Sequence, residues 1–193
     1  LLGHYEVLDR VLGAMVQVDT VEHALRDCSR IAGTTTVAMA RLQLNLAKNY
    51  HNSGELDRAD EAFDRAFALV QTHKANESLG VQADIYSLWG RMYEQRARER
   101  IEVTGTPAPM DADLENAAVL YRKGINIANR LMEKTNLREG LCRQMEISRT
   151  YCHARLANVA RLRGRFVRAR QLYLESLVDF IRLGHLIGVG HVV

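Results

Sequence analysis

Residues 46–67, LAKNYHNSGELDRADEAFDRAF, decide the fold of this chain. Two stretches of helical composition meet there at a turn that contains Gly54. The second stretch places Ala59 four residues before Phe63, so the two side chains share one face of a helix of period 3.6. A small residue beside a large one lets a neighbouring helix approach closely and fills the gap left by the adjacent turn. The segment therefore predicts a pair of packed helices.

The same arrangement recurs twice further along the chain. The alanine-to-aromatic spacing of four returns at Ala117 and Tyr121, and again at Ala169 and Tyr173. A second helical stretch with a small residue at its centre precedes each pair: Leu46-Ala47-x-x-Tyr50, Trp89-Gly90-x-x-Tyr93 and Leu156-Ala157-x-x-Ala160. Recurrence of this kind indicates an all-α array of antiparallel helix pairs, since one pair cannot bury its own apolar face.

The apolar spacing and the turn residues divide the chain into helices of ordinary length. We expect helices at about 4–17, 20–32, 36–53, 56–73, 78–101, 112–134, 138–163 and 166–183. Residues 1–35 would form a degenerate leading pair and 36–185 three full pairs, while 186–193 would begin a further helix. Asp111 is placed to cap the helix that follows it.

An inserted segment at about 96–111 lengthens the second pair. It begins with a charged helix extension in which Glu94 with Arg98, and Arg98 with Glu102, are spaced as i,i+4 ion pairs. A loop with both prolines of the chain, Pro107 and Pro109, follows. We interpret the segment as a solvated arm because charge runs usually form solvated faces. The alternative is a docking element, since long loops in compact arrays are often functional.

The composition excludes several classes of protein. The chain has 193 residues, of which 47% are hydrophobic and 25% charged, and its net charge is +3. No run approaches the ~20 apolar residues of a membrane span. Cys142 and Cys152 would lie about 15 Å apart along one helix, too far for a disulfide. Reduced cysteines favour a cytoplasmic location.

Sequence signals of catalysis are absent. The chain contains no P-loop, G-x-G-x-x-G, G-x-S-x-G or H-E-x-x-H motif. Its seven histidines show no metal-ligand spacing on one helix, and His153 falls at a helix-packing position. We therefore expect no enzyme activity, no cofactor and no metal site.

The two ends suggest a segment of a longer protein. The chain begins at Leu1 without methionine and ends on an apolar run that includes Ile181, Leu186 and Ile187. A repeat array normally covers its last helix with a polar capping helix. We expect this end either to receive a following repeat or to mediate self-association.

These repeats resemble the tetratricopeptide repeat (TPR) family, whose first helix carries large-x-x-Leu-small-x-x-aromatic and whose second carries Ala-x-x-x-aromatic. The resemblance covers 36–183 well and 1–35 weakly. The proline that usually closes each repeat is missing, and the period exceeds 34 residues. Longer repeats without proline resemble the helical sensor arms of bacterial signal-transduction regulators. The resemblance implies a right-handed superhelical α-solenoid.

In that family the first helix of each pair lines a concave binding groove. Carried over to this chain, the resemblance places these residues in the groove: Arg41, Asn45, Lys48, Arg91, Arg155, Asn158 and Arg161. Guanidinium and ammonium groups pair with carboxylates, and asparagine can hold a peptide backbone. We therefore expect a non-catalytic scaffold of a larger bacterial-type regulator that binds an acidic peptide or partner helix.

Two other functions remain open at this stage. The first is a sensor arm for a small ligand whose binding is relayed to an output domain. The second is nucleic-acid binding through the arginines of the C-terminal third: Arg149, Arg155, Arg161, Arg163, Arg165, Arg168 and Arg170. Phosphate affinity needs clustered positive charge, but these arginines straddle a turn and two helices and no aromatic-basic module accompanies them. We rank that hypothesis last of the three.

Overall fold

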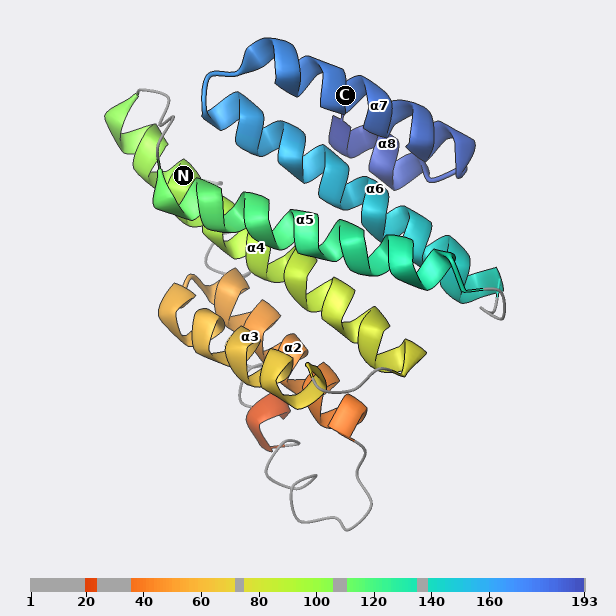
Figure 1. Ribbon diagram of the computed structural model, residues 1–193. Coiled ribbons are helices and arrows are strands. Elements are labelled where there is room, and N and C mark those ends of the chain that lie inside the picture. Colours follow the sequence, from red (N-terminus) through yellow and green to blue (C-terminus); the bar gives the residue numbers. More distant parts are fainter. Residues whose placement is uncertain (1–19, 24–35, 72–74, 106–110, 135–138, 193) are drawn as a thin grey trace. The chain divides into compact units, whose positions relative to one another are not determined.

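A computed structural model describes most of the chain as α-helix (Figure 1). The described residues are 20–23, 36–71, 75–105, 111–134 and 139–192. The helices are α2 (Thr36–Ser53), α3 (Leu56–Val70), α4 (Asn76–Thr104), α5 (Ala112–Met132), α6 (Glu139–Leu162), α7 (Phe166–Arg182) and α8 (Leu186–Val192). Each of the helices expected beyond residue 35 is present, with ends that differ by a few residues.

The expected leading pair lies largely outside the described residues. Of its two helices, 4–17 lies wholly outside them, and only 20–23 of the second is described and helical. The chain forms two compact units, Leu1–Val81 and Gln82–Val193, and the boundary between them falls within α4.

In the first unit, α2 packs against α3 through the small and large residues of the repeat pattern. Ala47 and Tyr50 of α2 are buried, as are Ala59 and Phe63 of α3. The alanines have no side chain beyond Cβ, so the two helix backbones can approach each other and the rings fill the space beside them. The segment that predicted a helix pair thus forms one.

The second unit contains the later part of α4 with α5, α6, α7 and α8. Within it, α5, α6 and α7 follow one another side by side, and the short α8 packs on α7 (Figure 1). Ala117, Tyr121 and Cys152 belong to its buried core. A Cβ on Gly90 of α4 would lie 2.8 Å from the ring of Tyr121, so any larger residue at this crossing would force the buried ring to shift. The small-residue position of the second repeat is therefore required by packing.

Three of the helix-to-helix turns have the same geometry. Gly54, Gly164 and Gly184 all have positive φ, 84°, 75° and 63°, which favours glycine. After each glycine, the next amide donates to the carbonyl five residues back: Glu55 to Tyr50 at 2.9 Å, Arg165 to Ala160 at 2.8 Å, and His185 to Phe180 at 2.9 Å. This pattern satisfies carbonyls at the end of the first helix and starts the second helix at once.

The start of α5 is fixed by the predicted cap. Both Asp113 and Leu114 donate their amides to Oδ1 of Asp111, at 2.9 and 3.0 Å. The Arg100 guanidinium contacts the carboxylates of Asp111 at 2.8 Å and Asp113 at 2.7 Å. Burial opposes ionisation of Asp111, but the hydrogen bonds from Arg100 and the amides outweigh it and lower the pKa of Asp111. These contacts tie the charged end of α4 to the first turn of α5.

Candidate functional site

The groove residues expected in the first repeat form a row on α2. Arg41, Asn45 and Lys48 are all exposed, and their spacing of four and three residues places them along one side of the helix. Tyr50 and Ala47, by contrast, are buried against α3. The three polar side chains are open to solvent and accessible to a ligand. Their role in peptide binding stays a prediction.

Two of the groove residues expected in the later repeats lie near each other in the second unit. Arg91 of α4 is exposed as a residue, but burial around its guanidinium, and then the charge of Arg155, lower the pKa of Arg91. Arg155 of α6 already has a partner, because its guanidinium lies 3.4 Å from a carboxylate oxygen of Glu94. The structure therefore brings Arg91 and Arg155 together, with Arg155 held in an ion pair within the protein.

Asn158 and Arg161, the other two expected groove residues on α6, differ from each other. The side-chain oxygen of Asn158 accepts a hydrogen bond from the hydroxyl of Tyr173 on α7. Arg161 is exposed. Because the row on α2 belongs to the first unit and these residues to the second, a single groove that joins them stays a prediction.

Glu94 is buried at the centre of a polar network that the sequence does not reveal. Its side chain is 1% exposed. It accepts from the hydroxyl of Tyr121 at 2.8 Å and from Arg98 at 2.8 Å, in addition to the contact with Arg155. Burial, and then the charge of Glu94, raise the pKa of Tyr121 well above its ordinary value. The Glu94–Arg98 pair that we interpreted as part of a solvated arm is therefore half inside the protein.

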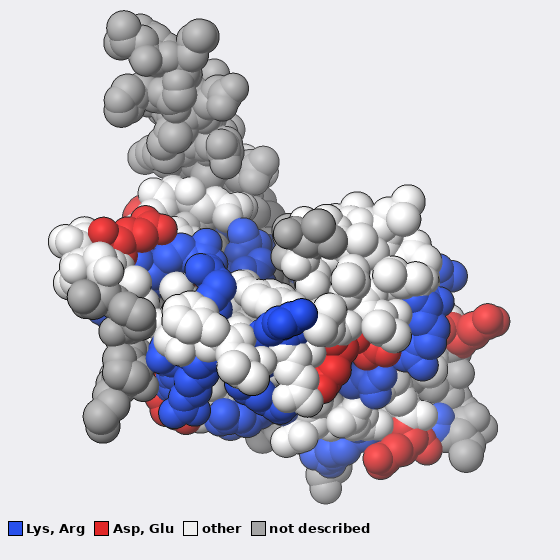
Figure 2. Space-filling view, turned by 90° about the horizontal axis from the view of Figure 1, so that it is seen from above, with Lys and Arg blue, Asp and Glu red and all other residues white. Residues whose placement is uncertain are grey.

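A hollow of about 400 Å³ lies between α5, α6 and α7. Its apolar part includes Ile125, Leu156 and Leu172. Its basic part consists of four arginines: Arg122, Arg163, Arg165 and Arg168. Three of the C-terminal arginines thus share one hollow with an arginine of α5. Figure 2 shows basic side chains spread over one face, with acidic side chains between several of them.

The outer side of α7 and α8 exposes an apolar face. Val178 and Ile181 of α7 are more than half exposed, as are Leu186 and Ile187 of α8. Such a run of exposed aliphatic side chains is typical of a surface that another protein covers.

The helix pairs, the small-residue crossing at Gly90 and the shared glycine turns describe a helical repeat protein. The family described as Tetratricopeptide Repeats-Sensor matches residues 13–139, more than half of the chain. This chain belongs to the Tetratricopeptide Repeats-Sensor family. Its fold class is therefore an all-α helical-repeat solenoid, and the expected likeness to sensor-type repeats is confirmed. No curated protein sequence matches the chain.

TPR-type repeats generally mediate interactions between proteins and are generally not catalytic. None of the helices in the described ranges combines the length and the apolar character needed to cross a bilayer. The described residues also contain no group of three histidine, cysteine or acidic side chains that could hold a metal ion.

The sequence did not predict two features of this site. The spacing of Glu94, Arg98 and Glu102 is that of an exposed charge ladder, and nothing in it marks Glu94 as buried. The hollow joins Arg122 to arginines more than forty positions away, which only the packing of α6 against both α5 and α7 brings together. A partial signal existed: Arg163 and Arg165 flank Gly164 of the repeated turn, so both lie in the turn between α6 and α7.

Proposed function

We propose that this TPR-type chain is a non-catalytic scaffold of a larger bacterial-type regulatory protein and binds an acidic peptide or partner helix. The observation that carries the proposal is the exposed row on α2. Arg41 and Lys48 offer positive charge to carboxylates, and Asn45 between them offers both a donor and an acceptor to a peptide backbone.

The second unit by itself offers further polar and charged groups to such a partner. Arg91 and Arg161 are exposed cations on α4 and α6. Arg155 and Asn158 already have partners within the protein, so a peptide would have to exchange those contacts to reach them. We therefore place the main charge contacts at Arg41, Lys48 and Arg91. Exposed ion pairs contribute roughly 0.2–1 kcal/mol each, so several must act together.

Affinity capture tests this proposal. The bait is the chain itself, beside an Arg41→Glu, Lys48→Glu, Arg91→Glu variant whose helicity is checked by circular dichroism. We expect a protein that the wild type retains and the variant loses, identified by mass spectrometry and then confirmed with a synthetic acidic peptide from that protein.

A matched variant controls for net charge. Arg65→Glu, Arg130→Glu, Arg170→Glu changes the charge by the same amount at exposed positions outside the proposed surface. It should retain the partner as well as the wild type does. Equal recovery with all three baits would contradict the role of the α2 row in binding the partner.

A second candidate function is that of a small-ligand sensor arm, whose occupied state is relayed to an output region. The description of the family as sensor repeats and the hollow between α5, α6 and α7 favour this candidate. A ligand that contacts three helices at once could alter their packing, which is how an array of nearest-neighbour repeats changes shape.

The proposal includes self-association through the apolar face of α7 and α8, supported by the exposure of Ile181 and Ile187. Light scattering over a range of protein concentrations should show dimers that the double variant Ile181→Glu, Ile187→Glu lacks. A monomer at every concentration would contradict this part. The proposal also places the chain in the cytoplasm, which the unpaired thiols of Cys142 and Cys152 support.

A further inference from the structure

The hollow between α5, α6 and α7 has the size and lining of a small-molecule site. Its volume of about 400 Å³ falls within the roughly 300–1,000 Å³ of such sites. Ile125, Leu156 and Leu172 give it apolar surface, and arginines give it positive charge at one side. Apolar walls with a few convergent charged groups are typical of sites that bind an organic ion.

Two of the four arginines share one carboxylate. Arg163 donates from Nη2 to Glu115 at 2.7 Å, and Arg122 lies 3.7 Å from the other oxygen of the same carboxylate. The Arg163 guanidinium, first by hydrogen bonding, lowers the pKa of Glu115. One negative charge thus faces two positive charges at this side of the hollow.

The other two arginines lack such a partner. Within the described part of the chain, Arg165 pairs with no carboxylate, and Arg168 donates to the amide oxygen of Gln171 at 2.8 Å. Glu175 is the acidic residue that lines the hollow. Its carboxylate accepts a hydrogen bond from the side-chain nitrogen of Gln171 at 3.0 Å. Positive charge therefore exceeds negative charge around the hollow.

Arg163 adds a more specific observation. Its side chain is only 9% exposed. Its Nε is buried and has no hydrogen-bond partner among the described residues. A buried donor without an acceptor is costly, and buried polar groups in proteins are nearly always paired. Arg163 therefore brings to the hollow a largely buried cation whose described carboxylate partner, Glu115, is shared with Arg122.

We propose that this hollow binds a small organic molecule through a phosphate or diphosphate group, held by Arg163, Arg165 and Arg168. Phosphate oxygens match the planar donor fork of arginine, and several arginines can bind one phosphate. The organic part would lie against Ile125 and Leu172. This site is separate from the α2 row, and it gives the sensor candidate its class of ligand.

The shape of the hollow favours a small molecule over a nucleic acid. A nucleic-acid strand needs a basic track that follows its backbone, with aromatic rings for base stacking. The hollow is confined between three helices, and its lining contains no tyrosine, tryptophan or phenylalanine. His153 also lines it, but burial, and then the charge of Arg149, lower the pKa of His153, so its ring is neutral at pH 7.

Calorimetric titration at low salt tests the site, with phenyl phosphate and inorganic pyrophosphate as probes. Arg165→Gln, Arg168→Gln removes two exposed cations from the hollow without touching the buried Arg163. The matched control Arg130→Gln, Arg170→Gln removes two exposed cations that do not line it. Glu175→Gln removes the lining acid.

The wild type should bind both probes saturably. Phenyl phosphate should bind more tightly than inorganic phosphate, titrated as a reference that has no organic part, because of the apolar surface. The Arg165/Arg168 variant should lose about tenfold or more in affinity. The Arg130/Arg170 control should match the wild type, and Glu175→Gln should gain about threefold.

Three results would overturn the proposal. They are no saturable binding at millimolar probe, an equal loss in the Arg130/Arg170 control, or a single-stranded oligonucleotide that binds more tightly than either probe through the same arginines. The variants here leave Arg41, Lys48 and Arg91 intact, so failure of this site and failure of the peptide surface are separate results.

Discussion

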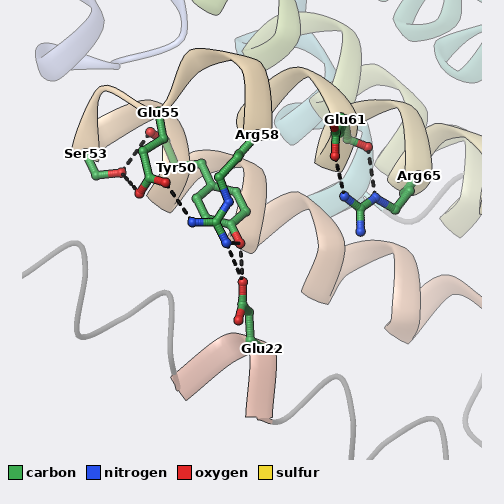
Figure 3. Close-up of polar contacts among 7 residues, drawn as sticks. All are labelled: Glu22, Tyr50, Ser53, Glu55, Arg58, Glu61 and Arg65. Carbon is green, nitrogen blue, oxygen red and sulfur yellow. Dashed lines mark hydrogen bonds and ion pairs between the residues drawn. The ribbon is translucent and has the colours of Figure 1, made fainter.

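The molecule contains two clusters in which a tyrosine hydroxyl donates to a glutamate beside arginine. In the first unit, Tyr50 donates to Glu22, and Arg58 contacts both (Figure 3). In the second unit, Tyr121 donates to Glu94 at 2.8 Å, with Arg98 and Arg155 beside it. The side chain of Glu22 is 34% exposed and that of Glu94 is 1% exposed.

The difference shows that burial, more than the kind of contact, sets the energetic weight of a polar cluster. An exposed charge that loses its partner is hydrated again and costs little. A buried charge has no such alternative, so loss of its partner leaves an uncompensated group in a medium of low dielectric constant. Figure 3 shows the first cluster between the helical turn at 20–23 and the α2–α3 pair. Because Glu22 is 34% exposed, water can replace a lost contact there.

Replacement of each glutamate in turn should give the largest difference in stability between the two clusters. Glu94→Ala should lower the free energy of unfolding of the second unit by about 3 kcal/mol, since Tyr121 loses its acceptor and Arg155 its carboxylate. Glu22→Ala should cost below about 1 kcal/mol. Fluorescence of Trp89, the single tryptophan, follows denaturation of the second unit, and hydrogen exchange of α2 and α3 follows the first.

The units must be followed separately because a chain of two compact parts need not unfold in one step. A cost for Glu22→Ala equal to that for Glu94→Ala would contradict the role given to burial.

A substitution at Gly90 tests whether the ring of Tyr121 in the buried cluster can move. In Gly90→Ala the new Cβ would meet the ring of Tyr121, which is fully buried and bonded to Glu94. The expected loss is roughly 1–3 kcal/mol, despite the better helix propensity of alanine. Gly140→Ala is the matched control, because a Cβ there meets nothing within 4 Å. It should gain up to about 1 kcal/mol. Equal thermal midpoints for both variants would show that the ring can move aside.

The sequence predicts those features of the structure that depend on residues close together along the chain. The turns at Gly54 and Gly164 and the alanine-aromatic pairs are local patterns, so their positions and their burial could be predicted. Glu94 could not, because its partners Tyr121 and Arg155 are 27 and 61 residues away. The arginine-lined hollow depends in the same way on the packing of α6 against both α5 and α7. Local periodicity determines which helices form, but not which polar side chains meet between them.

Alkaline titration compares the two tyrosines directly. Burial, and then the hydrogen bond to Glu22, raise the pKa of Tyr50 to about 12. Below a pH of about 10 both folded and unfolded chains hold this proton, so the contribution to stability is complete. From there to pH 12 the unfolded chain loses the proton first, and stability falls.

Absorbance at 295 nm, taken as the wild type minus Tyr50→Phe, should therefore show one ionisation near pH 12. The difference between the wild type and Tyr121→Phe should show no ionisation before the unit unfolds, because burial raises the pKa of Tyr121 well above its ordinary value. Ionisation of Tyr121 at a lower pH than Tyr50 would reverse the ranking of the two clusters.

The smallest expected difference in stability is between an arginine in a cluster and an arginine in an isolated ion pair, both in the first unit. Arg58 contacts Glu55 at 2.7 Å, Glu22 at 3.1 Å and the hydroxyl of Tyr50 at 2.6 Å, and it covers the ring of Tyr50. Arg65 pairs with Glu61 alone, at 2.9 Å (Figure 3). Arg58→Met should lower the free energy of unfolding by about 1 kcal/mol and Arg65→Met by about 0.3 kcal/mol, since one ordered guanidinium serves several partners in the cluster.

Both losses should shrink in 1 M salt, that of Arg65→Met nearly to zero, because both arginines are exposed. A cost for Arg58→Met that salt does not change would mean that its contact with the Tyr50 ring, and not its charge pairs, stabilises this edge of the helix pair.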